Sequence, residues 1–526
     1  MSRTTKSLFL KSTLIILVSN LIVKIISGGF KIPLVWLIGS DGMGLFSSAF
    51  NIYIFAYMQS AAGFPVAISK LVAECEAKNN EYEAKRVFHV ALIILVILGL
   101  FFSSLTYIGA KSIATGFLKN SRAYFPLICI SPAILFVTIS SAFKGYFQGK
   151  QNMYPTAVSN ILDSLGKLIF GCALSFILFR YGIEYASGGA SLGVSIGTFV
   201  GFVLLVFLYI KNNKRIKRTG KTRSYRMIAK ELLWIAIPIT ISACASSLIS
   251  LVDTFTITNR LQASGLVNEV TANRLFGYYS GYAQTLFRIP FVLTVGLATA
   301  VVPSISNYIA SGFKKAGEEV AKFSLKIVLL FTIFCVAMYY VLSFSMLKFI
   351  FPSANKLSAE LLSFLAPSIL FLGMFNIMQA ILQAYGKVIK PILFILAGVV
   401  TSFLINWFAI PIGGIYYASI ASCTCYFVIF VLTFIYMLKV TRLKLSFKEF
   451  VIKPIIYIIT LFFTMQLCYK YFAFNNFLGL FLSVGISGIF YILIMFSFGS
   501  ITIEELKMIP RTEKLVRALK KFRICQ

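Results

Sequence analysis

Long apolar stretches recur along the whole chain, with short polar segments between them. A helix needs roughly 20 apolar residues to cross the hydrocarbon core of a bilayer, and most of these stretches reach that length. The pattern predicts an all-α integral membrane protein with fourteen spans and no separate soluble domain. The predicted spans are 12–38, 45–69, 87–109, 123–143, 155–179, 188–210, 232–258, 275–303, 320–343, 359–383, 389–410, 415–438, 451–469 and 477–498.

Composition and charge agree with this interpretation. Of the 526 residues, 59% are hydrophobic and only 13% are charged, whereas a soluble protein carries about 25% charged residues. The net charge of +32 could suggest a nucleic-acid partner. With the N-terminus inside, however, the inner segments hold 32 of the 49 Lys and Arg residues and the outer loops hold 9. Such a bias sets the orientation of membrane helices, so we expect no nucleic acid and two cytoplasmic termini.

The two halves of the chain contain similar sequence segments. The segment Ser131–Phe136 matches Ala366–Phe371, and Gln148 and Gln383 follow at the same offset of 235 residues. Six spans per half place both halves in the same orientation, which predicts parallel repeats. The predicted parts are an N-lobe (1–210), a basic cytoplasmic linker (211–230), a C-lobe (231–440), an additional helix pair (441–499) and a cytoplasmic amphipathic tail (500–526).

Apart from Lys322, Glu360 and Lys390 at the ends of spans, eight charged residues fall inside the predicted spans. Intramembrane charges are expensive and usually face a bundle interior or a watery cavity. Lys326 and Lys453 lie close to cytoplasmic ends, so we expect both side chains to extend to the membrane surface. The other bases outnumber the acids by four to two, which favours an anionic cargo unless these groups only pair with one another between helices. The six residues are Lys24, Lys31, Lys167, Arg288, Asp163 and Asp253.

The bases are the candidate substrate-binding residues. Lys24 and Lys31 are seven residues apart, so they share one face of the first helix about 10 Å apart along its axis. Arg288 lies near the middle of the eighth predicted span, two residues before Pro290. Proline removes a backbone donor and bends a helix, which marks this position as special. Lys167 is a further candidate for the same cavity.

The acids are candidates for coupling or for a gate. Asp163 and Lys167 have the i, i+4 spacing of a helical ion pair, which could simply neutralise itself during insertion. Asp253 lies in the outer part of the seventh predicted span.

No catalytic, nucleotide or metal motif stands out. The loop Gly145–Gln151 superficially resembles a phosphate-binding loop, but it is too short, lacks a Ser or Thr after Lys150 and follows a membrane helix instead of a strand. The nine cysteines include no CxxC motif, and His89 is the single histidine. We therefore expect neither a cofactor nor an enzyme.

Three segments carry a family resemblance. Lys144–Pro155 resembles the loop between helices 4 and 5 of the stage V sporulation protein B family. Arg288–Pro303 is similar to helix 8 of that family, and Val252–Thr254 with Asn259–Leu261 is similar to its helix 7. The similarity extends over the whole chain.

This resemblance implies a polysaccharide-transporter protein related to MurJ-type lipid II flippases and, more distantly, to MATE multidrug exporters (the MOP superfamily). It implies a V of two six-helix lobes, alternating access and export of undecaprenyl-linked sugars across a bacterial cytoplasmic membrane, with a cationic cavity for the lipid diphosphate. Lys24 and Lys31 fall close to the helix 1 arginines of that pattern. Arg288 lies one turn from the helix 8 arginine position, where Thr285 stands, and residues 57–59 lack the helix 2 arginine.

The resulting hypothesis is a flippase for a cell-wall, spore-cortex or polysaccharide precursor, with a lipid-linked anionic saccharide and membrane lipids as its partners. One alternative is a cation-coupled, MATE-like antiporter, which would favour carboxylates in its cavity. Another is a scaffold without transport activity, whose partners would be cell-wall synthesis proteins.

The charge bias generates a topology prediction. In a cysteine-free background, single cysteines at Ser40 and Gly414 should react with an impermeant thiol reagent added to intact cells. Cysteines at Asn212 and Thr512 should react only after permeabilisation, because the basic inner segments stay in the cytoplasm. Labelling of position 212 in intact cells would reverse the predicted orientation.

Overall fold

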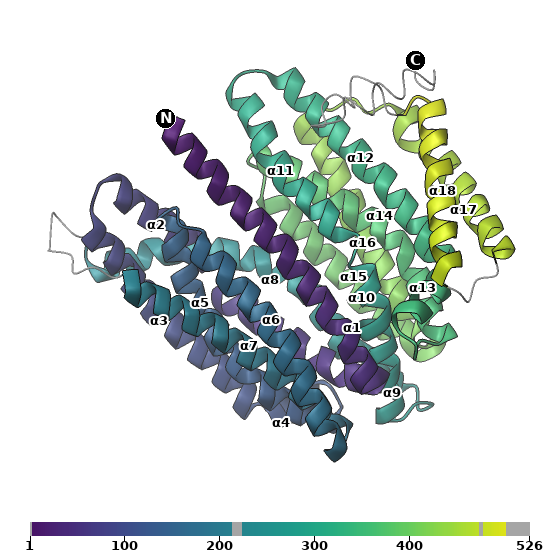
Figure 1. Ribbon diagram of the computed structural model, residues 1–526, viewed down its shortest axis with the longest axis horizontal. Helices are drawn as coiled ribbons and strands as arrows, with labels where there is room; N and C mark the ends of the chain where they lie inside the picture. Colours follow the sequence, from purple (N-terminus) through teal and green to yellow (C-terminus); the bar gives the residue numbers. More distant parts are fainter. Residues whose placement is uncertain (1–2, 213–222, 473–476, 501–526) are drawn as a thin grey trace. The chain divides into compact units, whose positions relative to one another are not determined.

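The computed structural model describes residues 3–212, 223–472 and 477–500. All regular secondary structure in these residues is helical (Figure 1). Thirteen stretches within them are long and apolar enough to cross a membrane, and the first of these, Ile25–Ala77, contains the second predicted span and the later part of the first. The prediction of an all-helical membrane protein is therefore confirmed. Most of the predicted linker and the tail after Ser500 lie outside the described residues.

The helices follow the predicted spans in order. The first part of the chain forms α1 (Arg3–Ala61), α2 (Phe64–Ala77), α3 (Glu81–Ile108), α4 (Ala110–Ser112), the π-helix η1 (Ile113–Phe117), the 3-10 helix η2 (Ser121–Ala123), α5 (Tyr124–Gly149), α6 (Tyr154–Leu178), the 3-10 helix η3 (Phe179–Tyr181) and α7 (Ile183–Asn212). The next part forms α8 (Tyr225–Ala263), α9 (Glu269–Gly277), the π-helix η4 (Tyr278–Ala283), α10 (Gln284–Phe287), α11 (Phe291–Ala310), α12 (Lys314–Val341), α13 (Ser343–Ile350), α14 (Lys356–Ala384), α15 (Ile389–Gly413) and α16 (Tyr416–Thr441). The last elements are the π-helix η5 (Lys448–Ile452), α17 (Lys453–Tyr471) and α18 (Phe477–Ser497).

The helices differ from the predicted spans at two places. The first predicted span and most of the second lie in one element, α1, with a kink at Gly39, whose φ of 61° and ψ of −165° leave the helical region. Glycine tolerates this left-handed φ without a steric penalty. The eighth span is broken between Phe287 and Phe291, and Pro290 directly precedes α11. The expected bend at Pro290 is thus a complete break in the helix.

The chain divides into two compact units. Unit 1 comprises Met1–Thr285 and Ser402–Ala418, and unit 2 comprises Leu286–Thr401 and Ser419–Gln526. The outer half of α15 belongs to unit 1 because α8 binds it directly. The Arg260 guanidinium donates from Nε to the Trp407 carbonyl at 2.9 Å and lies 4.4 Å from the centre of the Trp407 ring. The division into an N-lobe and a C-lobe at the basic linker stays a prediction.

Glycines let α6 and α7 approach each other closely in unit 1. A Cβ at Gly193 would lie 2.2 Å from the Gly171 backbone, and a Cβ at Gly197 would lie 2.6 Å from the backbone nitrogen of Lys167. Hydroxyl groups bind the two helices at both ends of this seam, because Ser159 donates to the Gly201 carbonyl and Ser175 to the Ala186 carbonyl. Such small-residue contacts are a main source of helix association in lipid.

Unit 2 is organised around α12, which packs against α11, α14 and the added hairpin of α17 and α18. The Tyr491 hydroxyl on α18 donates to the Leu330 carbonyl on α12 at 2.9 Å. The Tyr339 hydroxyl on α12 donates to the Leu286 carbonyl, at the start of the broken region, at 3.0 Å. The helix pair without a counterpart in the repeat is therefore an integral part of unit 2.

The α6–α7 seam generates a stability prediction. Replacement of Gly197 by Ala should lower the free energy of unfolding by about 1–3 kcal/mol, because the new methyl group meets backbone that cannot move aside. Gly485→Ala in α18 is the matched control, since nothing lies within 4 Å of its added Cβ. Thermal unfolding of the purified variants in detergent is the measurement. An unchanged midpoint for Gly197→Ala would contradict the tight contact.

Candidate functional site

The α1 lysines lie beside the α6 polar residues. The hydroxyls of Ser27 and Ser164 are 3.4 Å apart, and Phe30 packs at Gly171, so α1 and α6 run side by side in the same direction. Lys31 is half-buried and lies one turn after Ser27. Lys24 lies one turn before Ser27 on the same face, but its side chain is outside the described residues.

The predicted Asp163–Lys167 pair is present on α6. Lys167 Nζ donates to Asp163 Oδ2 at 2.8 Å, and the two side chains are 19% and 18% exposed. The other carboxylate oxygen, Oδ1, has no hydrogen-bond partner in the described part of the chain. It borders a small cavity among α5, α6 and α7. The lining residues are Val137, Ser140, Lys144, Ser159, Asp163, Thr198 and Gly201.

Arg288 lies in the break between α10 and α11, where its side chain is exposed. It belongs to unit 2, whereas Lys24 and Lys31 belong to unit 1. The convergence of these three residues on one cavity therefore stays a prediction. Thr285, at the position of the family's helix 8 arginine, is buried, and its hydroxyl lacks a hydrogen-bond partner among the described residues.

Asp253 of α8 is held inside unit 1 by side chains from two other elements, η4 and α15. It is 2% exposed on α8 and accepts hydrogen bonds from the Tyr279 hydroxyl of η4 at 2.9 Å and from Asn406 Nδ2 of α15 at 3.1 Å. Asn406 Nδ2 also lies 3.0 Å from Thr256 Oγ1. The carboxylate is thus fixed in one orientation, as a gate or coupling residue requires. The described residues contain no group of three or more His, Cys, Asp and Glu side chains that could hold a metal ion.

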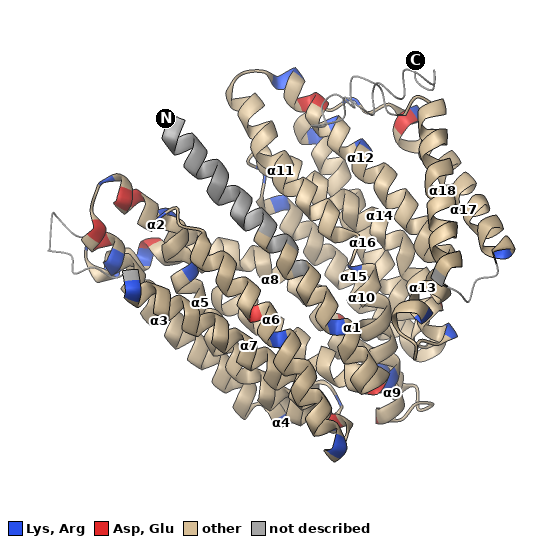
Figure 2. Ribbon diagram, in the orientation of Figure 1, with Lys and Arg blue, Asp and Glu red and all other residues tan. Residues whose placement is uncertain are grey.

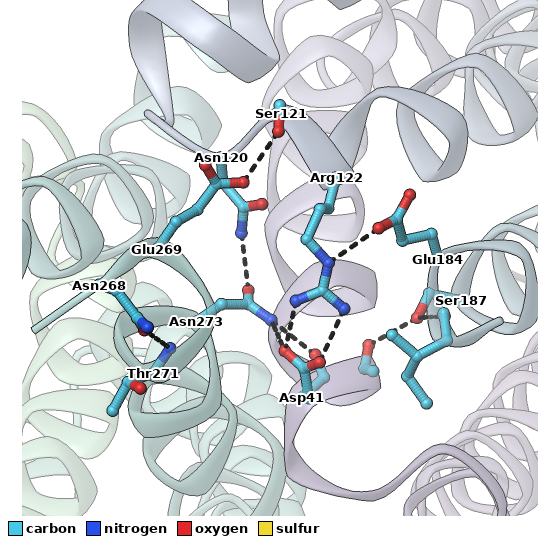
Figure 3. Close-up of polar contacts among 12 residues, drawn as sticks. Asp41, Asn120, Ser121, Arg122, Glu184, Ser187, Asn268, Glu269, Thr271 and Asn273 are labelled. Carbon is cyan, nitrogen blue, oxygen red and sulfur yellow. Dashed lines mark hydrogen bonds and ion pairs between the residues drawn. The ribbon is translucent and has the colours of Figure 1, made fainter.

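A second polar cluster, which we call the outer network, joins four segments predicted to face outward (Figure 3). Arg122 donates to both carboxylate oxygens of Asp41, at 2.7 and 3.2 Å, and its Nε donates to Glu184 at 2.9 Å. Asn273 of α9 donates to the same Asp41 carboxylate at 2.6 Å and to the Asp41 carbonyl at 2.7 Å. Arg122 and Asp41 are only 16% and 17% exposed, so these charge-assisted bonds are well shielded from solvent.

The segment before Arg122 extends this network to α8. The side chains of Asn259 and Thr258 donate to the Phe117 and Leu118 carbonyls at 2.7 and 3.2 Å. Gln262 donates to the Lys119 carbonyl at 3.0 Å. Unpaired backbone carbonyls are costly near lipid, so α8 and this loop satisfy each other at their common end.

The opposite end of unit 1 carries an inner cluster. Arg223 donates to Glu83 of α3 and Glu231 of α8, and Lys150 lies 3.2 Å from Glu76 at the end of α2. Burial disfavours the Arg223 charge, but the hydrogen bonds and negative charge of these glutamates outweigh it and raise the pKa of Arg223. Segments predicted to share a side of the membrane therefore meet at the same end of unit 1, as the helix alternation requires.

Charged residues are sparse along the membrane helices and concentrate near their ends (Figure 2). Lys453 is consistent with the expectation for a surface-reaching lysine, because it is half-buried at the start of α17 and its Nζ lies 3.5 Å from the Gly499 carbonyl. The same expectation is wrong for Lys326, which is only 8% exposed on α12. Its position in the sequence is close to the helix end, but packing inside unit 2 covers it.

Several polar residues of these sites escaped the sequence analysis. Asp41 and Arg122 fall between the predicted spans, where charged residues carry no signal of their own. Asn273 and Asn406 are fully buried amides in apolar surroundings, which would have marked them as paired residues. Lys144 was assigned to a loop because the predicted span ended at residue 143, whereas α5 continues to Gly149.

A sequence model of the polysaccharide biosynthesis protein family matches residues 9–309, more than half of the chain. The chain belongs to this family. A model of the MatE family also matches residues 279–408. The predicted family resemblance is thereby confirmed.

Two curated relatives come from Bacillus subtilis (strain 168). Stage V sporulation protein B is 27% identical over 97% of this chain and 99% of its own length. The lipid II flippase MurJ is 26% identical over 76% of this chain and 77% of its own length. Together with the apolar helices, these similarities indicate a multi-pass bacterial membrane protein.

Solved structures show the fold. A lipid II flippase MurJ in an inward closed conformation superposes with a TM-score of 0.71 at 15% identity, covering 91% of this chain and 98% of that chain. An inward-facing MATE-family transporter of the MOP superfamily gives a TM-score of 0.67 at 15% identity, covering 80% and 94%. The predicted MOP-like fold is confirmed.

The outer network generates an accessibility prediction. Arg122→Gln should leave the Asp41 carboxylate without its ion-pair partner. The closed state of the outer end should then be less stable by about 1–3 kcal/mol. A cysteine at Ser47, which is buried two turns deeper in α1 than Asp41, should then react several-fold faster with impermeant thiol reagent added outside. Arg180→Gln is the control, because that arginine, also predicted to face outward, lies over the neighbouring Tyr181 ring and forms no ion pair with a described acid. Equal labelling rates in both variants would show that the network does not close this end.

Proposed function

We propose that this protein is a flippase that moves an undecaprenyl-diphosphate-linked sugar across the bacterial cytoplasmic membrane by alternating access. The cargo is a precursor of cell wall, spore cortex or polysaccharide. The proposal assigns no enzymatic step to the chain. The names of its relatives, a lipid II flippase and a stage V sporulation protein, support this class of cargo.

The observation that carries the proposal is the excess of bases along the α1–α6 face of unit 1. Lys31 and Lys167 lie at a similar depth, because the Ser27–Ser164 and Phe30–Gly171 contacts align the two helices. Asp163 is the described acid that pairs with Lys167 in this region. A diphosphate cannot enter hydrocarbon unpaired without a cost of many kcal/mol. Lysines at this depth would replace its water, while the polyprenyl tail stays in lipid.

Alternating access requires an end that opens and closes. The outer network supports this role, since its side-chain hydrogen bonds join the first half of the chain to α8 and α9 of the second half. Release of cargo to the outside would break these bonds, and rebinding of Arg122 to Asp41 would close the end again. Such a bistable contact is what a two-state transporter needs.

The cation antiporter is the second candidate, and the buried Asp253 is the observation that favours it. A carboxylate that accepts from Tyr279 and Asn406 could exchange a proton or a cation during transport. Under the flippase proposal, Asp253 instead serves coupling or a gate and does not bind the cargo. A scaffold role for cell-wall synthesis proteins is the third candidate, and it predicts no transport.

Reconstituted transport tests the proposal. Purified protein in vesicles should move a fluorescent undecaprenyl-diphosphate sugar between leaflets. Lys24→Gln and Arg288→Gln should each slow it at least about tenfold, because a lost charge-assisted contact costs on the order of 1.5–3 kcal/mol. Lys24→Arg should retain more activity than Lys24→Gln, because it keeps the positive charge.

Lys453→Gln is the matched control, since Lys453 is a membrane-helix base at an exposed end. Normal transport by both Lys24→Gln and Arg288→Gln would contradict the proposed cationic cavity. Export of cationic dyes that depends on Asp253, without movement of the lipid, would establish the antiporter instead.

A further inference from the structure

A second lysine faces the Asp163 carboxylate. Lys144 on α5 lines the same small cavity as Asp163, and the two side chains interact electrostatically. Among the described carboxylates, none forms an ion pair with Lys144. Asp163 is therefore one acid between two bases, and its direct bond to Lys167 leaves Lys144 uncompensated.

The described titratable groups that interact with Asp163 are two lysines and two tyrosines, and Lys31 of α1 lies at a similar depth. The titratable groups that face it are Lys144 from α5, Lys167 from α6, and Tyr53 and Tyr57 from the second segment of α1. From α7 come Thr198 and glycines, which are neutral. Its Oδ1 atom has no hydrogen-bond partner among the described residues, so a proton could be placed there without breaking an existing bond.

Lys144 and Lys167 together resemble a phosphate-binding site in which the Asp163 carboxylate takes the place of the phosphate. A carboxylate and a phosphate are both anions that bind lysine through charge-assisted hydrogen bonds. When a phosphate takes Lys167, an ionised Asp163 would remain beside it as an unpaired and repelling charge. Protonation of the carboxyl removes both penalties, because burial and a nearby like charge each disfavour the ionised form.

We propose that Asp163 occupies the lysine site in the empty protein and is displaced, with uptake of one proton, when the cargo's diphosphate binds Lys167 and Lys144. The proposal rests on the flippase function and adds Lys144 as a binding residue and Asp163 as its proton-linked competitor. No covalent bond changes: the proton moves from water to the Asp163 carboxylate on binding and returns to water when the cargo leaves. Cargo movement is thereby linked to proton movement.

Binding of geranylgeranyl diphosphate to the full-length protein in nanodiscs tests the proposal. Calorimetry in two buffers of different ionisation enthalpy should give an uptake of about one proton per ligand beyond the ligand's own titration. Affinity should rise as the pH falls from about 8 to about 6, by no more than about tenfold per pH unit, the limit for one linked proton.

Variants of Asp163 and Lys144 test which residue takes up the proton and which lysine binds the diphosphate. Asp163→Asn should bind more tightly at high pH and lose the extra proton uptake, whereas Lys144→Gln should weaken binding several-fold and keep that uptake. Lys144→Arg should restore binding, since it retains the charge. Lys150→Gln is the matched control on the same helix, because Lys150 pairs with Glu76 outside the cavity.

The outcomes separate the two proposals. Absence of diphosphate binding in the wild-type protein would overturn the proposed function and this inference with it. Binding without extra proton uptake by the wild-type protein would overturn the inference alone, whatever the variants do. Unchanged affinity in Lys144→Gln would remove Lys144 from the site.

Discussion

The hydrocarbon core offers no hydrogen bonds, and this constraint governs the rest of the structure. Every backbone group at membrane depth must be satisfied within the protein, which restricts the chain to helices. The same constraint applies to the polar side chains that the helices carry. Asp253 is bound by Tyr279 and Asn406, and Asp163 by Lys167, because an unpaired charge at that depth would cost several kcal/mol.

Close helix packing places these polar groups. Lipid tails are as apolar as leucine, so the hydrophobic effect contributes little to helix association, and small residues allow backbones to approach instead. Gly193 and Gly197 bring α7 directly onto α6 at Gly171 and Lys167. This contact fixes the side of α6 that carries Asp163 and encloses the cavity that Lys144 shares. The glycines of α7 thus place the Asp163–Lys167 ion pair beside this cavity.

The ends of unit 1 serve a different purpose from its middle. At membrane depth, Asp163 binds Lys167, and Asp253 accepts from Tyr279 and Asn406. At the outer end, Arg122 and Asn273 bind Asp41 together, and at the inner end Arg223 joins Glu83 to Glu231. Side-chain bonds of this kind can break and reform without unfolding a helix. A transporter needs a rigid middle that binds and ends that can separate, and the charges of unit 1 are distributed in this way.

The sequence alone determined the helices, their order, the family and the ion pair of Asp163 and Lys167, because apolar length and i, i+4 spacing are local properties of a chain. It did not determine the break before α11 in full, the burial of Lys326 or the role of Arg122. Those depend on which residues meet from distant parts of the chain, such as Asp41 with Asn273 or Asp253 with Asn406. Apolar helices have many compatible neighbours, so only the tertiary packing selects the partners that a buried polar side chain finds.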